Sequence, residues 1–223
     1  MTTTDKYAVF GNPIKHSKSP QIHSAFARQT QQNISYRAHQ VDEGKFSDAA
    51  SSFFANGGKG LNITVPFKLD AYDFADELSA RARCAGAVNT LAMQEDGRIY
   101  GDNTDGAGLV RDICENLAWD IGGKRVLLLG AGGAIRGVLE PLIKLKPAHL
   151  LIANRTVKKA QQLARDFSQF GDVSACSFEA LRANQFDLII NGTSASLAGE
   201  LPPLPSEALT DEGCCYDMMY SAG

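Results

Sequence analysis

The sequence of 223 residues lacks the features that mark membrane, secreted and nucleic-acid-binding proteins. No apolar run approaches the roughly 20 residues that a membrane-spanning helix requires. The start, MTTTDKYAVFG, has no basic segment followed by a long apolar one, so no secretory signal is expected. The formal net charge of −3 argues against a general nucleic-acid binder, whose surface would be basic. We therefore expect neither a membrane nor nucleic acid among the partners of this chain.

Metal-ligand and redox patterns are also missing. The five cysteines contain no CxxC pair, which argues against zinc-finger and thioredoxin-like functions. Cys214 and Cys215 are adjacent in an apolar run and are expected to be reduced, half-buried strand residues. The four histidines show no spacing such as HExxH, so no metal is expected. This pattern fits a reducing, cytoplasmic location.

What the sequence does contain is an alternation of short apolar runs and helical patterns, which predicts an α/β protein. In the first hundred residues we expect strands at 6–11, 34–41, 61–65, 87–94 and 98–103. Helices are expected at 19–29, after the strand at 34–41 as far as about Phe54, and at 68–78. In the second half we expect strands at 125–130, 149–154, 173–178, 186–191 and 214–220, with helices at 105–117, 134–145 and 157–169. Two domains follow, 1–104 with a mixed sheet and 105–223 with a parallel sheet covered on both faces.

A glycine-rich turn, GAGGAIRG at 130–137, ends an apolar strand and opens a helix. Gly130 permits the tight turn, Gly132 permits close approach of a ligand, and the helix N-terminus offers N–H groups to a pyrophosphate. Ile135 departs from the dinucleotide fingerprint, which has Gly or Ala there, so we expect a slightly displaced helix with binding retained. A turn without a ligand is the alternative. The position of these glycines between a strand and a helix predicts a Rossmann-like domain.

The end of the next strand distinguishes the two nicotinamide cofactors. An NAD site would carry Asp or Glu about 20 residues after the glycines, to hold the ribose hydroxyls. This chain has NRTVKK at 154–159 instead, with Arg155, Thr156 and Lys159 available to a phosphate. The sequence therefore favours NADP over NAD. The alternative is that Arg155 and Lys159 only begin a solvated helix face.

The stretch NITVPFK at 62–68 places polar residues among apolar ones in the first domain. Asn62 and Thr64 are two apart on a strand and share a face. If Lys68 and Asp105 meet between the domains, each offsets the other's desolvation, and Lys68 can exchange a proton near neutral pH. Asn62, Thr64 and Asn89 then complete a ring of donors and acceptors for a polyhydroxylated ligand. Separately, Lys68 could be a surface lysine and Asp105 only an N-cap.

Two serines near the start suit an anion. Ser17 and Ser19, in HSKSP at 16–20, lie at the mouth of the helix that begins at Ser19, where a carboxylate would be stabilised. Pro20 fits the first helical position, and capping alone could also explain Ser19.

Together these motifs resemble the shikimate dehydrogenase family, in order along nearly the whole chain. They are SxSP at 17–20, N-[VI]-T-x-P-x-K at 62–68, AGAVNT at 85–90, GDNTDG at 101–106, GAGGA at 130–134, NRT at 154–156 and YDMMY at 216–220. The set is far more specific than any one motif. The resemblance implies two α/β domains, the first binding substrate and the second binding NADP. It implies reduction of 3-dehydroshikimate by NADPH to give shikimate.

The resemblance also implies roles for individual residues. Lys68 would be the general acid in reduction and Asp105 its partner. The ring carboxylate would be held by Ser17, Ser19 and Tyr220, and the ring oxygens by Thr64, Asn89, Lys68 and Asp105. NADP would be held by Gly130, Ala131, Gly132, Gly133, Ala134, Asn154, Arg155, Thr156 and Lys159, with Thr193, Ser194 and Met218 along the dinucleotide path.

Two other functions stay open, and a homodimer is possible. An NAD-linked quinate/shikimate dehydrogenase is disfavoured by Arg155, and a non-catalytic metabolite-binding homologue is disfavoured by the presence of both Lys68 and Asp105. Family members continue for several tens of residues beyond the YDMMY motif, with a glycine segment, a glutamine that contacts substrate, and a helix that packs on the first domain. A chain ending at Gly223 is therefore expected to bind NADP but to turn over poorly.

Overall fold

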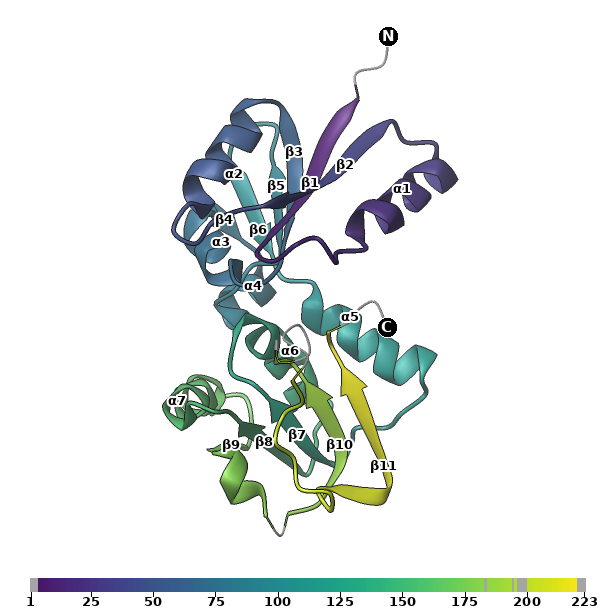
Figure 1. The fold of residues 1–223 in the computed structure, drawn as a ribbon, viewed down its shortest axis with the longest axis vertical. Helices are drawn as coiled ribbons and strands as arrows, with labels where there is room; N and C mark the ends of the chain where they lie inside the picture. Colours follow the sequence, from purple (N-terminus) through teal and green to yellow (C-terminus); the bar gives the residue numbers. More distant parts are fainter. Residues whose placement is uncertain (1–3, 183, 194, 196–199, 220–223) are drawn as a thin grey trace. The chain divides into compact units, whose positions relative to one another are not determined.

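The computed structural model describes residues 4–182, 184–193, 195 and 200–219. The chain divides into two compact units, Met1–Thr104 and Asp105–Gly223. Each contains its own sheet (Figure 1). No helix in the described part of the chain is long and apolar enough to cross a membrane.

The first unit has a mixed sheet in the order β2-β1-β3-β5-β6-β4, which confirms the expected α/β class. Its strands are β1 (Asp5–Gly11), β2 (Ile34–Gln40), β3 (Gly58–Ile63), β4 (Glu77–Leu78), β5 (Thr90–Met93) and β6 (Ile99–Asp102). Strands β2, β1 and β3 are parallel, whereas β5 is antiparallel to both β3 and β6. Its helices are α1 (Ser19–Thr30), α2 (Phe46–Ala55), α3 (Lys68–Phe74) and α4 (Ala80–Ala85).

Aromatic rings fill the core between α2, α3 and this sheet. Phe46 packs on Phe67 with ring centroids 5.5 Å apart and on Phe10 at 6.4 Å, and all three are almost completely buried. Burial of each such side chain contributes about 1.5–3 kcal/mol, so this cluster fixes both helices against the strands.

Several element boundaries of the first unit differ from the prediction: β5 begins at Thr90, β4 and α4 were not expected, and two further differences concern β3 and α3. Strand β3 begins at Gly58, inside the stretch expected to be a turn, because the Phe53 ring lies over Gly58. A Cβ at Gly58 would be only 2.1 Å from that ring. The helix expected at 68–78 ends at Phe74, where Ala75 turns to an extended conformation and β4 follows.

The second unit has a parallel sheet in the order β11-β10-β7-β8-β9, which confirms the Rossmann-like class. Its strands are β7 (Arg125–Leu129), β8 (His149–Ala153), β9 (Val173–Cys176), β10 (Phe186–Asn191) and β11 (Leu209–Asp217). Its helices are α5 (Asp105–Arg111), which continues as a π-helical turn (Asp112–Asn116), α6 (Gly133–Lys144) and α7 (Val157–Phe167), with a 3-10 turn (Phe178–Leu181). From β7 the chain adds β8 and β9 on one side and then β10 and β11 on the other, so the strand order switches between β7 and β10. Open α/β sheets bind ligands at such a switch point.

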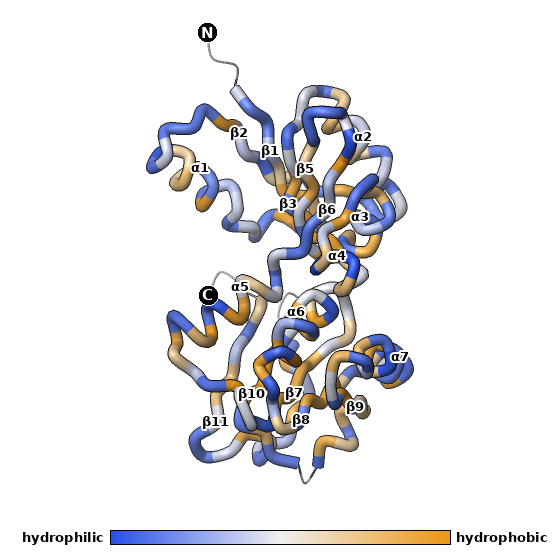
Figure 2. Tube along the Cα trace, turned by 180° about the vertical axis from the view of Figure 1, so that it is seen from behind, coloured by the Kyte–Doolittle hydropathy of each residue, from blue (hydrophilic) through white to orange (hydrophobic). Residues whose placement is uncertain are grey.

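Strands β7 and β8 carry the core of this unit and are drawn mainly in hydrophobic colours in Figure 2. Val126, Leu127 and Leu128 are fully buried, as expected when helices cover both faces of a parallel sheet. Strand β11 forms one edge of the sheet and begins earlier than expected, at Leu209. Cys214 is half-buried as predicted, but Cys215 is exposed, because alternate residues of this edge strand face solvent.

Candidate active site

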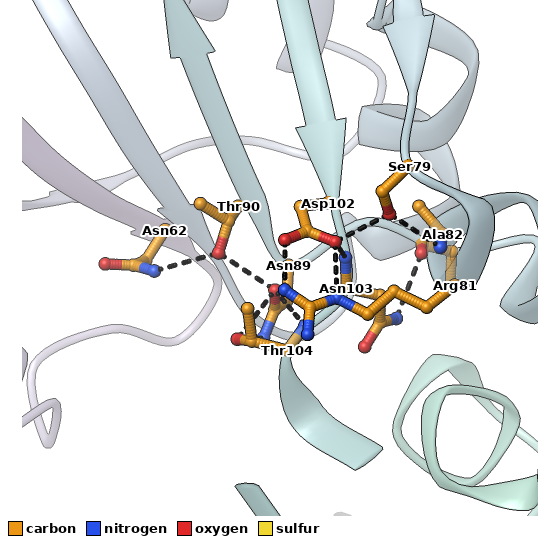
Figure 3. A network of polar contacts seen from close by, with 10 residues as sticks. Asn62, Ser79, Arg81, Ala82, Asn89, Thr90, Asp102, Asn103 and Thr104 are labelled. Atoms are coloured by element: carbon orange, nitrogen blue, oxygen red, sulfur yellow. Dashed lines mark hydrogen bonds and ion pairs between the residues drawn. The ribbon is translucent and has the colours of Figure 1, made fainter. Parts of the chain in front are cut away.

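Amide and hydroxyl side chains of the first unit meet at one edge of its sheet (Figure 3). This edge is formed by the carboxyl ends of β3 and β6 and the amino end of β5, because β5 runs antiparallel to its neighbours. Asn62 is paired in register with Thr90, and Thr90 with Asp102. The pairing places polar residues from three strands side by side.

Asn62 and Asn89 belong to a continuous chain of hydrogen bonds. The Tyr36 hydroxyl donates to Asn62 Oδ1 at 2.6 Å, and Asn62 Nδ2 donates to Thr90 Oγ1 at 3.4 Å. Thr90 Oγ1 in turn donates to Asn89 Oδ1 at 2.9 Å. Asn89 Nδ2 donates to Thr104 Oγ1 at 2.9 Å, and the Thr104 N–H donates back to Asn89 Oδ1 at 3.0 Å. The amide of Asn89, only 9% exposed, is therefore held in one orientation.

Asp102 anchors the loop that follows β6, a role that the sequence did not indicate. Its Oδ1 accepts hydrogen bonds from Ser79 Oγ at 2.6 Å, Arg81 Nε at 2.7 Å and the Asn103 N–H at 2.8 Å. A second Arg81 nitrogen binds Oδ2, so the pair is bidentate. The Arg81 guanidinium lowers the pKa of the Asp102 carboxyl to about 2. Buried Asn103 donates to the Ala87 carbonyl at 3.0 Å and ties this loop to the segment before Asn89.

Thr64 and Lys68 follow β3 at the same edge. The Thr64 N–H donates to the Phe10 carbonyl at 3.0 Å, so the segment stays attached to β1 beyond the end of β3. Gly11 permits this approach, because a Cβ there would lie 2.5 Å from Thr64 Cγ2. Lys68 is the first residue of α3 and is half-buried, and its carbonyl accepts from the Val88 N–H at 2.8 Å. Lys68 and Asn89 are thus fixed to each other through the backbone.

The serines near the start occupy the entrance of α1. The Ser19 N–H donates to Ser17 Oγ at 3.3 Å. The prediction that Ser19 is the N-cap is wrong: Lys18 holds that position, and Ser19 is the first helical residue. Ser17 satisfies the N–H of Ser19 from outside the helix, so a side-chain cap at Ser19 is not needed.

Tyr220 and Asp105 complete the predicted substrate-binding residues. Tyr220 lies outside the described residues. Asp105 is the first residue of the second unit, whereas Lys68 belongs to the first. The pairing of Lys68 with Asp105 stays a prediction.

The glycine turn of the second unit joins β7 to α6. Gly130 has φ +106°, a conformation that side chains disfavour, and its N–H donates to the Ala153 carbonyl of β8 at 2.8 Å. Gly132 is the N-cap of α6, and a Cβ built there meets no atom within 4 Å. Open space at Gly132 and free N–H groups at the helix start fit a pyrophosphate. Ala131, Gly133 and Ala134 complete this turn.

Ile135 is accommodated by a glycine elsewhere in the chain. Its side chain is fully buried, and its Cδ1 would lie 2.4 Å from a Cβ at Gly192, just after β10. The absence of a side chain at Gly192 therefore makes room for the residue that replaces the third glycine of the fingerprint. The sequence contained Gly192 but gave no reason to pair it with Ile135.

The segment after β8 carries the predicted phosphate-binding residues. Asn154 Nδ2 donates to the Thr156 carbonyl at 2.9 Å, which bends the chain into α7, and Thr156 is the N-cap of that helix. Arg155 and Lys159 are exposed, and neither has an ion pair or side-chain hydrogen bond with any residue that the structure describes. Both are available to an anion at the start of α7.

The ends of β10 and β11 are joined by Asn191, another residue that the sequence did not single out. Its Oδ1 accepts from the Thr193 hydroxyl at 2.8 Å and from the Thr193 N–H at 3.0 Å. Its Nδ2 donates to Asp217 Oδ1 at 3.2 Å, and its carbonyl accepts from the Met218 N–H at 2.9 Å. Thr193 and Met218 are therefore held together beside the glycine turn. Ser194 falls outside the described residues.

Comparison with known proteins gives family matches in both units. Residues 9–91 match the family model described as the shikimate dehydrogenase substrate binding domain, and residues 111–198 match that of shikimate / quinate 5-dehydrogenase. The chain is 59% identical to a protein of Cellvibrio japonicus named shikimate dehydrogenase (NADP(+)), over 98% of this chain and 79% of the relative.

Solved structures agree with these matches. An Ael1 enzyme from Pseudomonas putida is 44% identical with a TM-score of 0.86, covering 99% of this chain and 80% of that one. The shikimate 5-dehydrogenase of Thermus thermophilus, crystallised with NADP(H) and shikimate, is 30% identical with a TM-score of 0.81, covering 96% of this chain and 78% of that one.

Proposed function

Since the chain belongs to the shikimate dehydrogenase family, we propose that it catalyses the NADP-dependent, reversible reduction of 3-dehydroshikimate to shikimate in aromatic amino-acid biosynthesis. The observation that carries the proposal is the held amide of Asn89 at the same sheet edge as Lys68. Such a fixed set of donors and acceptors suits a ligand with several ring oxygens, because their geometry need not change on binding.

In this proposal the predicted substrate-binding residues contact defined parts of the substrate. Ser17 and Ser19 bind the ring carboxylate at the start of α1, with Tyr220. The ring oxygens are held by Thr64, Asn89, Lys68 and Asp105, and Asn62 is held in place by Tyr36 and Thr90.

Lys68 supplies the proton. Negative charge grows on the carbonyl oxygen during reduction, and an ammonium within hydrogen-bond reach stabilises that charge and then donates its proton. In the oxidation direction, neutral Lys68 accepts the hydroxyl proton. Asp105 acts as the partner that keeps the ammonium oriented.

The second unit fits NADP by its donor set. The turn from Gly130 to Ala134 cradles the pyrophosphate at the start of α6, Asn154, Arg155, Thr156 and Lys159 surround the 2′-phosphate, and Thr193, Ser194 and Met218 line the remaining path. The cofactor, when bound, supplies the hydride. No carboxylate occurs in 154–159 to repel the 2′-phosphate, which favours NADP over NAD.

A shikimate-dependent assay of NADP⁺ reduction tests the function, with NAD⁺ and quinate as alternative substrates. Replacing Lys68 by Ala should lower turnover by about 10²–10⁴-fold while the affinity for NADP stays nearly unchanged. Lys59→Ala, at an exposed position on β3, is the matched control and should keep full activity. Unchanged turnover in Lys68→Ala would show that another group is the acid. Wild-type turnover no faster than that of an inactive Lys68→Ala variant, with NADP binding intact, would favour a metabolite-binding role.

Location and assembly are also proposed. We assign the protein to the cytoplasm because its five cysteines are free thiols and NADPH-dependent biosynthesis takes place there. A homodimer is a further prediction, which light scattering of the purified chain would test.

A further inference from the structure

A groove of about 590 Å³ lies beside the edge strand β2 of the first unit, lined by residues of β1, β2 and α2. It exists because α2 packs on β3 and α1 packs on β2, so that the α2 side of β2 stays uncovered (Figure 1). This volume lies within the range of small-molecule sites, about 300–1,000 Å³. We propose that the groove is a second ligand site, specific for a planar aromatic carboxylate.

Strand register directs three basic side chains into the groove. Ala8 of β1 pairs with Arg37 of β2, Phe10 with His39, and Lys6 with Ser35. Paired residues of neighbouring strands share a face, as do residues two apart on one strand. Lys6, Arg37 and His39 therefore all line the α2 side.

The charged side chains that line the groove are all basic. None of the described residues that line it is acidic, although the chain as a whole has a net charge of −3. Lys6 Nζ donates to the Asn56 carbonyl at the end of α2, at 2.9 Å, which fixes its position across the groove. The Arg37 guanidinium has no ion pair or hydrogen bond with any of the described residues. A guanidinium binds a carboxylate through two parallel N–H groups, so Arg37 is the anion contact.

The floor of the groove is aromatic. The half-buried Phe53 ring lies 5.8 Å from that of Phe10 and 6.5 Å from that of His39. Phe53 cannot move inward, because its ring rests on Gly58. A flat ring stacks well on such a surface, whereas an aliphatic ring of the same size gains less. The aromatic floor beside an unpaired cation selects for an aromatic anion over a simple one.

The groove is separate from the polar edge described above. Arg37 lies on the α2 side of β2, whereas its neighbour Tyr36 points the opposite way, where it stacks on His23 of α1 at 4.2 Å and binds Asn62. The proposal therefore does not depend on the proposed catalytic function.

Amide chemical shifts measured during titration with benzoate test the proposal. Saturating shikimate is present in one series, because the serines at α1 could also attract a carboxylate. We expect saturable shifts at β2 and α2 that are the same with and without shikimate. Cyclohexanecarboxylate, with the charge but no aromatic ring, and benzamide, with the ring but no charge, should each bind at least several-fold more weakly.

Arg37→Gln should weaken benzoate binding about tenfold, the loss expected for one charged hydrogen-bonding partner. Arg28→Gln, which removes an exposed arginine from α1, is the matched control and should change nothing. The proposal is overturned if β2 and α2 show no shifts, if Arg37→Gln binds as tightly as wild type, or if both control compounds bind equally well. It is also overturned if the shifts follow protein concentration instead of benzoate, since the groove would then be an interface between two copies.

Discussion

The two candidate binding regions of this protein are built on opposite principles. At the polar edge of the first unit, the side chains that would face substrate are held by other side chains: Asn89 by Thr90 and Thr104, and the loop after β6 by Asp102. In the second unit, the turn is made of glycine backbone, and its cations Arg155 and Lys159 have no partner among the described residues.

The difference reflects the ligands that each region would bind. A small ring with several oxygens is distinguished by the angles between donors, which require rigid amides. A dinucleotide phosphate is recognised by charge and by N–H groups at a helix start, which need little side-chain support. Substitutions at the polar edge should therefore affect both stability and substrate binding, whereas substitutions at the phosphate-binding residues should affect only the cofactor.

Among the substitutions that test this comparison, the largest effect is expected at Arg155. Arg155→Gln should raise the KM for NADP by about 10–100-fold, because a charged bidentate contact to the 2′-phosphate is lost. The KM for NAD, which lacks that phosphate, should hardly change. The free energy of unfolding should change by less than about 0.5 kcal/mol, since Arg155 is an exposed residue.

Arg165→Gln at the other end of α7 is the control and should leave both KM values as they are. If Arg155→Gln loses affinity for NADP and NAD equally, Arg155 supports the turn between β8 and α7 and does not bind the 2′-phosphate. The comparison between the two regions would then fail, because the second would also depend on side-chain support.

Asp102→Asn, in contrast to Arg155→Gln, should lower stability. Loss of the charge that binds Arg81 and Ser79 should lower the free energy of unfolding by about 1–2 kcal/mol, as measured by urea denaturation at neutral pH. Because the pKa of Asp102 is lowered to about 2 in the folded protein, its contribution is present above the ordinary carboxyl pKa of about 4. It is lost as the pH falls from about 4 to 2, so wild type and variant should converge there.

Asp172→Asn, at an exposed position before β9, is the control for this acid-range experiment. A constant difference between wild type and Asp102→Asn down to pH 2 would show that packing at Asp102, and not its charge, holds the loop.

The fold class and the positions of the key motifs were predictable because periodicity and turn chemistry are local. The apolar run at β7, the glycines after it and the alternation of Asn62 with its neighbours each depend on adjacent residues. Partners that come from distant segments were not predictable. Asp102 stabilises the loop through Arg81 on α4, and no spacing in the sequence joins them.

The same reason explains what the sequence did not show. Ile135 departs from the fingerprint and was expected to displace the helix slightly, and the structure adds that its space is provided by Gly192, more than fifty residues later. Gly58 looked like part of a turn, but the Phe53 ring occupies the side-chain position that it leaves empty in the strand. In each case tertiary packing decided what local propensity left open.

A smaller effect is expected at Tyr36, which holds Asn62 but is not expected to contact substrate. Tyr36→Phe keeps the stacking on His23 and removes the 2.6 Å hydrogen bond. The KM for shikimate should rise about 3–10-fold, with a smaller change in kcat and none in the KM for NADP. Tyr72→Phe, on α3 and packed against the core, is the control. A fall in kcat alone, with KM unchanged, would instead place Tyr36 in the proton-transfer step.

The smallest effect is expected at Tyr216, whose side chain joins β11 to the π-helical turn. Its hydroxyl donates to Asp112 Oδ2 at 2.8 Å, and burial together with that carboxylate raises the pKa of Tyr216 to about 12. A raised pKa means that the contribution to stability is complete below about pH 10 and is lost as the pH rises towards 12. Tyr216→Phe should therefore cost about 0.5–1 kcal/mol at neutral pH, and this difference should disappear in alkali. Kinetics with NADP should be unchanged, because this pair supports the fold and not the phosphate-binding residues; a raised KM for NADP in Tyr216→Phe would show that the second unit, like the first, positions its ligand through side chains.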